Sequence, residues 1–232
     1  KGIDAQHLTY LEAGESAARA GVAWVALHGR TAAQMYGGHA DWDAIRNLKD
    51  HLRQLNTPVL GNGDIWTGSD ALEMMARTGA DGVVVGRGCL GRPWLFSQLT
   101  AAFAGEELPT EPRLGRVLQI LRRHAELLTL DYGEAKGCRD MRKHMSWYLK
   151  GFSVAHTVRQ ALGTVQTLAE IDALVAQIDS DQAFNSEVGS GPRGRTSGSR
   201  RPALPDRWLE TCELTADDRV NVSLAELSVS GG

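Results

Sequence analysis

Apolar residues in the first hundred positions alternate between helical spacing and short continuous runs. Continuous runs at residues 22–27, 58–60 and 82–85 are typical of strands that are covered on both faces. Before, between and after these runs, apolar residues recur every three or four positions, which predicts helices, one of them capped by Asp41. Helices and strands in strict alternation with short connections favour a parallel α/β fold.

Beyond a Pro-containing stretch at residues 109–112, the pattern is helical only. Helices are predicted at about residues 113–128, 136–149, 154–162 and 167–178, and the last opens with a capping-box pattern. Short loops between such helices favour a small all-α bundle. From residue 180, Gly, Ser, Arg and Pro prevail, a composition that predicts disorder. We therefore expect an α/β domain at residues 1–108, a helical domain at 113–179 and a disordered tail at 180–232.

Composition argues against several classes of protein. No apolar run approaches the roughly 18 residues that a membrane-spanning helix needs, so no membrane partner is expected. The 232-residue chain has three widely spaced cysteines, an odd number that argues against a disulfide scaffold and favours a reducing, cytoplasmic location. No cluster of Cys and His has the spacing of metal ligands, so no metal site is expected.

Charge is segregated along the chain. The formal net charge is −3, yet residues 113–160 hold 10 Lys and Arg against 4 Asp and Glu. On charge alone, this block either meets an anion or is an ordinary solvated face. A helix over residues 136–150 places its apolar residues on one side and a basic strip on the other. The strip consists of Lys136, Arg139, Arg142, Lys143 and Lys150. Asp140 is the one acidic residue in this stretch, which favours RNA binding through phosphate contacts.

A polar cluster with glycine follows each predicted strand. The clusters are His28-Gly29-Arg30-Thr31, Gly61-Asn62-Gly63-Asp64 and Gly86-Arg87-Gly88. Because the carboxyl ends of parallel strands meet at one edge, we expect the three clusters to line one ligand site. The glycines let main-chain N–H groups approach a phosphate, and Arg87 adds a guanidinium. Each cluster alone also fits an ordinary turn, so it is their repetition that favours a phosphate-bearing ligand.

Three side chains in these clusters are candidates for chemistry. His28 is expected to point into the mouth of the site, where an imidazole donates to a cofactor ring or a substrate carbonyl; the alternative is a core His held by main chain. Arg30 is a candidate contact for substrate or phosphate. Cys89 has no basic partner that the sequence identifies, and we expect it to be structural.

Together these motifs resemble the tRNA-dihydrouridine synthase family over roughly residues 1–178. The matching stretches are residues 28–31, 58–65, 81–88, 91–96, 139–144 and 147–151. The resemblance implies the C-terminal portion of a (β/α)8 TIM barrel, followed by a helical tRNA-binding domain. It also implies a flavoprotein that uses FMN as cofactor and NADPH as reductant to convert uridine in tRNA to 5,6-dihydrouridine.

The resemblance assigns roles to individual residues. The segments that hold the FMN phosphate end match Asn62, Gly63, Asp64, Gly86 and Arg87, and the His beside the flavin ring matches His28. Contacts with substrate and tRNA are expected from Arg30 and from Arg139, Arg142, Lys143 and Lys150.

The family's catalytic Cys, and a Lys just upstream of this region, have no counterpart in the chain. We therefore expect a fragment with the last three barrel strands, inactive alone, from an enzyme that is monomeric at full length. Two alternatives stay open: a non-catalytic RNA-binding module, and a different FMN-dependent TIM-barrel oxidoreductase.

Overall fold

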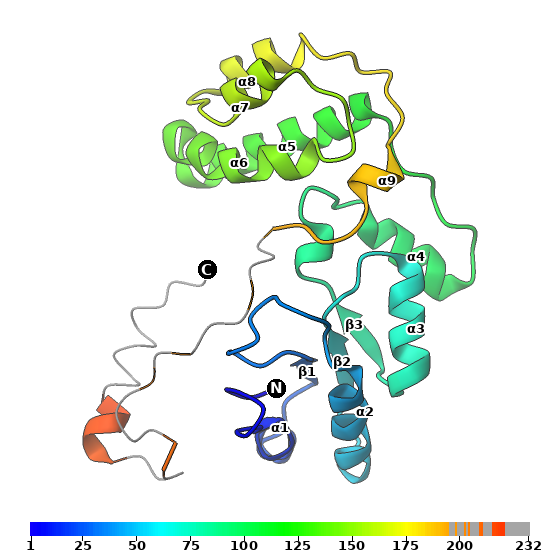
Figure 1. The fold of residues 1–232 in the computed structure, drawn as a ribbon, viewed down its shortest axis with the longest axis vertical. Helices are drawn as coiled ribbons and strands as arrows, with labels where there is room; N and C mark the ends of the chain where they lie inside the picture. Colours follow the sequence, from blue (N-terminus) through cyan, green and yellow to red (C-terminus); the bar gives the residue numbers. More distant parts are fainter. Residues whose placement is uncertain (195–197, 199–201, 203, 205–208, 211–214, 221–232) are drawn as a thin grey trace.

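The computed structural model describes residues 1–194, 198, 202, 204, 209–210 and 215–220. A parallel sheet is formed by β1 (Val25–His28), β2 (Val59–Asn62) and β3 (Gly82–Val84), in the order β1-β2-β3 (Figure 1). Val25 pairs with Val59, and Leu60 pairs with Gly82. The predicted parallel α/β fold is confirmed, although β1 begins at Val25 rather than at residue 22 and includes His28.

Four helices accompany the sheet in chain order. They are α1 (Tyr10–Arg19), α2 (Trp42–His51), α3 (Gly68–Thr78) and α4 (Leu95–Ala104), and α2 and α3 lie side by side along it (Figure 1). The Asp41 carboxylate accepts hydrogen bonds from two N–H groups in the first turn of α2, as predicted. At the start of α3, Thr67 and Asp70 form a reciprocal capping box, and Gly79 ends the helix with a φ of 70°. Short 3-10 helices, η1 (Arg53–Leu55) and η2 (Arg87–Cys89), follow α2 and β3.

The sheet and α1–α4, residues 10–104, form what we call the sheet lobe. Its core lies between the sheet and the helices and contains Ile45, Val59 and Met74, all fully buried. Strand residues that point the other way are more open: Ala26 is exposed and Leu60 is half-buried. Side chains alternate between the two faces of a strand, so helices cover one face of this sheet more completely than the other.

Helices α5 (Leu114–Tyr132), α6 (Glu134–Tyr148), α7 (His156–Leu162) and α8 (Leu168–Val175) form the helical lobe, residues 114–175, which has a hydrophobic core of its own. Leu121, Met141 and Met145 are buried there, where α5 and α6 pack along their lengths. Gly137 permits the close crossing, because a Cβ at this position would lie 2.6 Å from the main-chain nitrogen of Thr129. Among the described residues, no helix is both long and apolar enough to cross a membrane.

The stretch at residues 109–112 is not helical, as predicted, but it is held in place. Glu111 accepts hydrogen bonds from the Trp94 indole, at 2.6 Å, and from Arg92, whose side chain is buried. This carboxylate therefore anchors the connection between the lobes to the start of α4.

Residues 180–194 differ from the predicted disordered tail. They contain a short helix, α9 (Ser186–Gly189). The ring of Phe184 packs edge-on against Phe152, with centroids 5.7 Å apart, and the buried Arg193 donates to the Gly189 carbonyl at 2.9 Å. The average composition of the segment predicts disorder, but the contacts of one aromatic ring and one arginine hold it in place. The remainder of the predicted tail lies largely outside the described residues.

Candidate functional site

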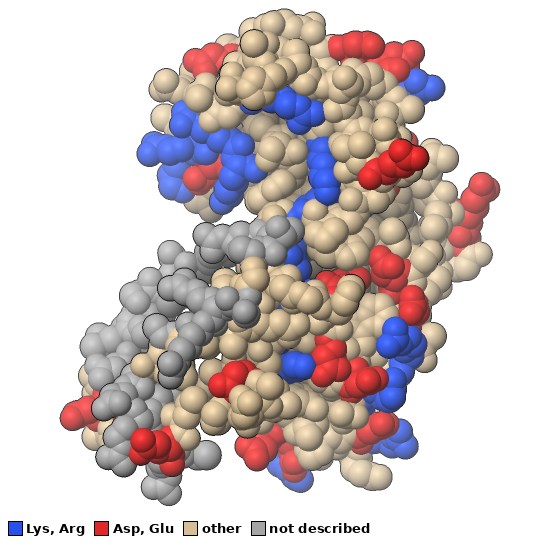
Figure 2. Space-filling model, viewed as in Figure 1, with Lys and Arg blue, Asp and Glu red and all other residues tan. Residues whose placement is uncertain are grey.

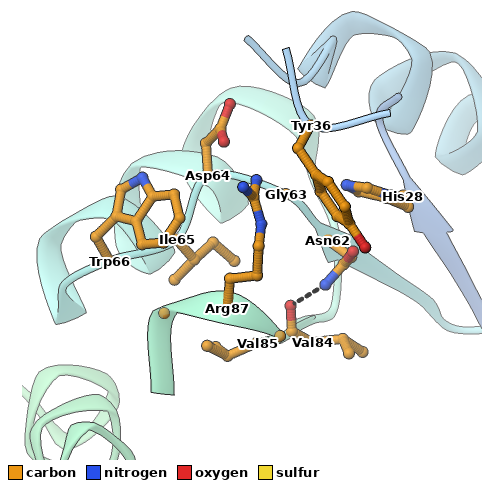
Figure 3. A pocket seen from close by; sticks show the side chains of 12 residues that line it. His28, Tyr36, Asn62, Gly63, Asp64, Ile65, Trp66, Val84, Val85 and Arg87 are labelled. Atoms are coloured by element: carbon orange, nitrogen blue, oxygen red, sulfur yellow. Dashed lines mark hydrogen bonds between the residues drawn. The ribbon is translucent and has the colours of Figure 1, made fainter. Parts of the chain in front are cut away.

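The carboxyl ends of the three strands meet at one pocket of about 230 Å³, which we call the strand-end pocket (Figure 3). His28 ends β1 and pairs with Asn62 at the end of β2, which in turn pairs with Val84 of β3. The Asn62 side-chain amide donates to the Val84 carbonyl at 2.6 Å. The structure thus brings together His28, Asn62, Gly63, Asp64, Gly86 and Arg87, all of which line this pocket.

Two glycines are needed for the loops to approach each other here. Gly63 has a φ of 121°, and a Cβ at this position would lie 2.6 Å from the Cβ of Ala40. A Cβ at Gly88 would lie 2.1 Å from the main-chain oxygen of Ile65. Neither position accommodates a side chain without movement of main chain or of a neighbouring loop.

The main chain of the third cluster offers hydrogen-bond donors. In the part of the chain that the structure describes, the N–H groups of Gly86 and Gly88 have no acceptor. Gly86 has open space where a side chain would stand, so the pocket reaches its backbone. Gly61 does not contribute as predicted, because a Cβ there would lie 2.3 Å from the sulfur of Met74, inside the core. Its role is close packing of α3 on β2.

Arg87 supplies a cation held between two aromatic rings. Its guanidinium carbon lies 4.6 Å from the centroid of Tyr36 and 5.5 Å from that of Trp66, and Figure 3 shows the side chain extending between them. Burial and the nearby Arg30 lower the pKa of Arg87. An anion in the pocket relieves both unfavourable effects. Sequence reasoning missed Tyr36 and Trp66; Trp66 stands two residues after Asp64, a position that could have flagged it.

Arg30 lies behind the pocket rather than in it. Its side chain is 2% exposed, and its Nη2 donates to both carboxylate oxygens of Asp64, at 2.7 and 2.9 Å. The same nitrogen donates to the Gly38 carbonyl at 2.7 Å, while Asp64 also accepts from the N–H of Ala40. The prediction that Arg30 contacts substrate is therefore not supported by its position. The pair ties the loop after β1 to the loop after β2.

His28 stands at the mouth of the strand-end pocket (Figure 3). Partial burial of the ring and the positive charge of Arg30 lower the pKa of His28, so the imidazole is neutral at pH 7. A neutral imidazole has one nitrogen that donates and one that accepts a hydrogen bond. Cys89, by contrast, donates its thiol to the Gly86 carbonyl at 3.1 Å, and burial raises its pKa, which opposes a role as nucleophile.

Only some side chains of the basic strip on α6 are exposed on the surface; others are hydrogen-bonded within the fold. Arg139 and Lys143 are exposed, and their side chains make no hydrogen bond within the described residues. Arg142 instead donates to the Val165 carbonyl at 2.8 Å, and Lys150 donates to the carbonyls of Ser190 and Pro192. Figure 2 shows Lys and Arg gathered on the side of the helical lobe where α6 lies. The strip predicted from the sequence is thus divided between a surface part and a structural part.

A parallel sheet whose strand ends meet at a pocket lined by Arg87, and by main-chain N–H groups that have no acceptor among the described residues, defines a class: α/β proteins suited to an anionic ligand at that edge of the sheet. Comparison with known proteins narrows this class. A model of the dihydrouridine synthase family matches residues 1–187. The chain belongs to this family, and the resemblance seen in its motifs is confirmed.

Individual relatives agree with the family model. A probable tRNA-dihydrouridine synthase of Mycobacterium tuberculosis (strain H37Rv) is 54% identical over 208 residues, which cover 90% of this chain and 53% of the relative. A probable tRNA-dihydrouridine synthase of Mycobacterium leprae is 52% identical over 232 residues, 100% of this chain and 58% of the relative. The tRNA-dihydrouridine synthase B of Pasteurella multocida is 35% identical over 164 residues, 71% and 48% of the two chains. The chain spans about half the length of these curated relatives.

Proposed function

We propose that this chain supplies the FMN phosphate site and the tRNA-binding helices of an enzyme that reduces uridine in tRNA to 5,6-dihydrouridine. The observation that carries the proposal is the presence, at the strand ends, of Arg87 together with the N–H groups of Gly86 and Gly88, which have no acceptor among the residues that the structure describes. Charged and main-chain donors in this arrangement suit a phosphate dianion. Family membership supports the reaction, which the names of the relatives state for those proteins.

The residues of the strand-end pocket fit the phosphate end of FMN. Arg87 and the glycine N–H groups would bind the phosphate, and Asn62 and Gly63 would border it. Asp64 does not oppose an anion, because its charge is already paired with Arg30. FMN, when bound, supplies the hydride that NADPH provides. His28 lies close to this site as a neutral hydrogen-bond donor, which suits a position beside the flavin ring.

The sheet lobe suits a portion of a (β/α)8 barrel. A barrel strand is covered by a helix on one face and by barrel interior on the other. Ala26 and Leu60 lie on the face that helices leave open, which a completed barrel would cover. On this proposal residues 1–108 are the C-terminal part of the barrel, and the residue that protonates the base lies on another part of the enzyme.

The helical lobe suits tRNA through its surface charge. Arg139 and Lys143 are the two members of the strip whose side chains are exposed and make no hydrogen bond among the described residues. Each can neutralise about one phosphate. We assign tRNA binding to residues 113–179 on this basis, with Arg142 and Lys150 supporting the fold.

Titration of the full chain with FMN and with riboflavin, followed by flavin fluorescence, tests the phosphate assignment. FMN is expected to bind and riboflavin, which lacks the phosphate, to bind far more weakly. Equal affinity for both flavins would refute the phosphate site. A non-catalytic RNA-binding module would bind neither flavin, and a different FMN-dependent oxidoreductase would bind FMN but show no affinity for tRNA.

A further inference from the structure

Helix α5 carries a second side-chain stripe beside the one that is buried in the core of the helical lobe. Val117, Leu121 and Ala125 are buried in that core. Ile120, His124 and Leu127 follow the same helical spacing on a different side of α5, and Leu127 is 48% exposed. Ile120, at one end of this stripe, packs partly against the core, whereas Leu127, at the other end, is apolar surface that the core leaves uncovered.

This stripe lines a cavity of about 510 Å³ between the two lobes, which we call the interlobe pocket. Helix α6 contributes His144 and Tyr148, one turn apart, and the segment after η2 contributes Leu90 and Pro93. The volume falls in the range of roughly 300–1,000 Å³ that is usual for small-ligand sites. Apolar walls and a few convergent polar groups are the usual composition of such sites.

The imidazole and phenol groups that line the pocket are uncharged at neutral pH. The Tyr148 hydroxyl and His124 Nδ1 share a hydrogen bond of 3.1 Å, and the rings of His124 and His144 meet edge-on, with centroids 4.8 Å apart. Burial, followed by the neighbouring His124, lowers the pKa of His144 to about 4. Burial likewise lowers the pKa of His124 and raises that of Tyr148 to about 12. Neutral imidazole and phenol groups can both donate and accept hydrogen bonds. Such groups suit a heteroaromatic base better than they suit a charged ligand group.

The rim of the pocket is basic. Arg116 and Arg123 lie on α5 beside the stripe and are exposed, although Arg123 also pairs with Glu126 at 2.7 Å. Lys143 of the basic strip does not line the pocket, but it belongs to α6, the helix that supplies His144 and Tyr148. A base in the pocket thus lies beside the helix that we assign to tRNA. The two rim arginines can meet two phosphates of one strand, which favours a nucleotide of an RNA strand over a free nucleotide.

The turn η2 also links the interlobe pocket to the strand-end pocket. Arg87 and Gly88 line the strand-end pocket, and Cys89, the next residue, lines the interlobe pocket. The two sites therefore lie on either side of one short helix. An RNA strand that delivers a uridine to a flavin held at the first site therefore passes close to the second.

We propose that the interlobe pocket binds one nucleotide of the substrate RNA other than the uridine that is reduced, with its base against His124, His144 and Tyr148. This inference rests on the proposed function, since it takes the RNA to be the substrate. It adds a specificity site that reads a base outside the reaction centre.

Proton NMR of the histidine imidazoles in the full chain tests the inference. His124 and His144 report on the interlobe pocket and His28 on the strand-end pocket, with resonances assigned through the His→Gln variant of each. The probes are a single-stranded RNA pentamer, uridine 5′-monophosphate and FMN, added separately. We expect the pentamer to shift the His124 and His144 resonances, and FMN to shift that of His28.

The outcomes separate the two proposals. If FMN leaves His28 unmoved while the pentamer moves His124 and His144, the flavin assignment fails and the nucleotide pocket stands. Unmoved His124 and His144 at saturating pentamer, or no binding of the pentamer at all, would overturn the pocket. Binding of uridine 5′-monophosphate as tight as that of the pentamer would overturn the assignment to RNA and indicate a site for free nucleotides.

A matched pair of variants on α5 gives an independent test with tRNA. Leu127→Glu places a carboxylate in the pocket, whereas Leu130→Glu makes the same change on the same helix at a residue that is 73% exposed and does not line it. Loss of one base contact predicts a tRNA affinity about 5- to 150-fold weaker for Leu127→Glu. The control should stay within roughly twofold, because exposed charges are screened by salt. Equal affinities for the two variants, with unchanged His124 and His144 resonances in the RNA-free proteins, would overturn the inference.

Discussion

The ion pair behind the strand-end pocket allows a quantitative test of how the loops are held. Asp64→Asn removes the charge that faces Arg30 and keeps the size of the side chain. Asn also tolerates the left-handed backbone of this position, where φ is 58°, so the substitution adds no backbone strain. The Arg30 side chain, 2% exposed, is then left without its counter-charge, and its Nη1 already has no hydrogen-bond partner among the described residues.

Removal of one partner from a buried ion pair costs about 3–5 kcal/mol of stability. Asp64 is 17% exposed, so solvent moderates the loss, and we expect a value near the lower end, about 3 kcal/mol. The matched control is Glu73→Gln, which breaks the pair of Glu73 with Arg77 on the surface of α3, where the side chains are 59% and 52% exposed. Exposed pairs contribute about 0–1 kcal/mol.

Urea denaturation followed by far-UV circular dichroism measures both variants against the parent chain. Similar m-values would show that the comparison concerns stability and not a change in the surface exposed on unfolding. The reasoning would be refuted if Asp64→Asn lowered the free energy of unfolding by an amount within about 1 kcal/mol of that for Glu73→Gln. Such a result would mean that other groups stabilise the charge of Arg30 when Asp64 is replaced.

Four further predictions concern other parts of the molecule. Arg87→Ala removes a charge-assisted contact of about 1.5–3 kcal/mol, so FMN affinity should fall roughly 10- to 150-fold, and unchanged flavin retention would mean that Gly86-Arg87 is only a turn. Arg139→Ala with Lys143→Ala should make the plot of log tRNA affinity against log salt shallower by about 1.5, with flavin binding intact; an unaltered slope would place the RNA elsewhere. Gly91→Ala should destabilise the contact between the lobes, since φ is +65° and the new Cβ would lie 2.3 Å from main chain in α6; a melting temperature equal to that of the parent chain would contradict this. The pKa of His144 is lowered to about 4 in the folded chain, so the unfolded chain binds one more proton between about pH 6.5 and 4, and the free energy of unfolding should decrease as the pH falls through that window. The decrease should be smaller in His144→Gln. An equal decrease in that variant would show that other groups cause it.

Local features of the fold could be predicted from the sequence. The cap of α2 at Asp41 depends on atoms a few residues apart, and the apolar runs depend only on their own composition. The grouping of His28, Asn62 and Arg87 at one edge followed from a general property of parallel strands. These predictions needed no knowledge of which side chains meet across the fold.

Contacts between distant residues were beyond such reasoning. Arg30 was predicted to face a ligand, yet its partner Asp64 comes from the loop after a different strand. Arg142 has the spacing of the basic strip, but the Val165 carbonyl lies within its reach in the folded lobe. Phe184 stands in a segment whose average composition predicts disorder, and a single ring packed in a suitable place outweighs that average.

The formation of dihydrouridine tests the central claim most directly. The chain would be joined behind the part of its Mycobacterium tuberculosis relative that it does not cover, and expressed in a host without dihydrouridine synthases of its own. Nucleoside mass spectrometry of the host tRNA then reports the product. We predict dihydrouridine in tRNA from cells that carry the joined protein, and a reduced amount when it carries Arg87→Ala. A folded, flavin-bound joined protein that leaves the tRNA without dihydrouridine would contradict the assignment.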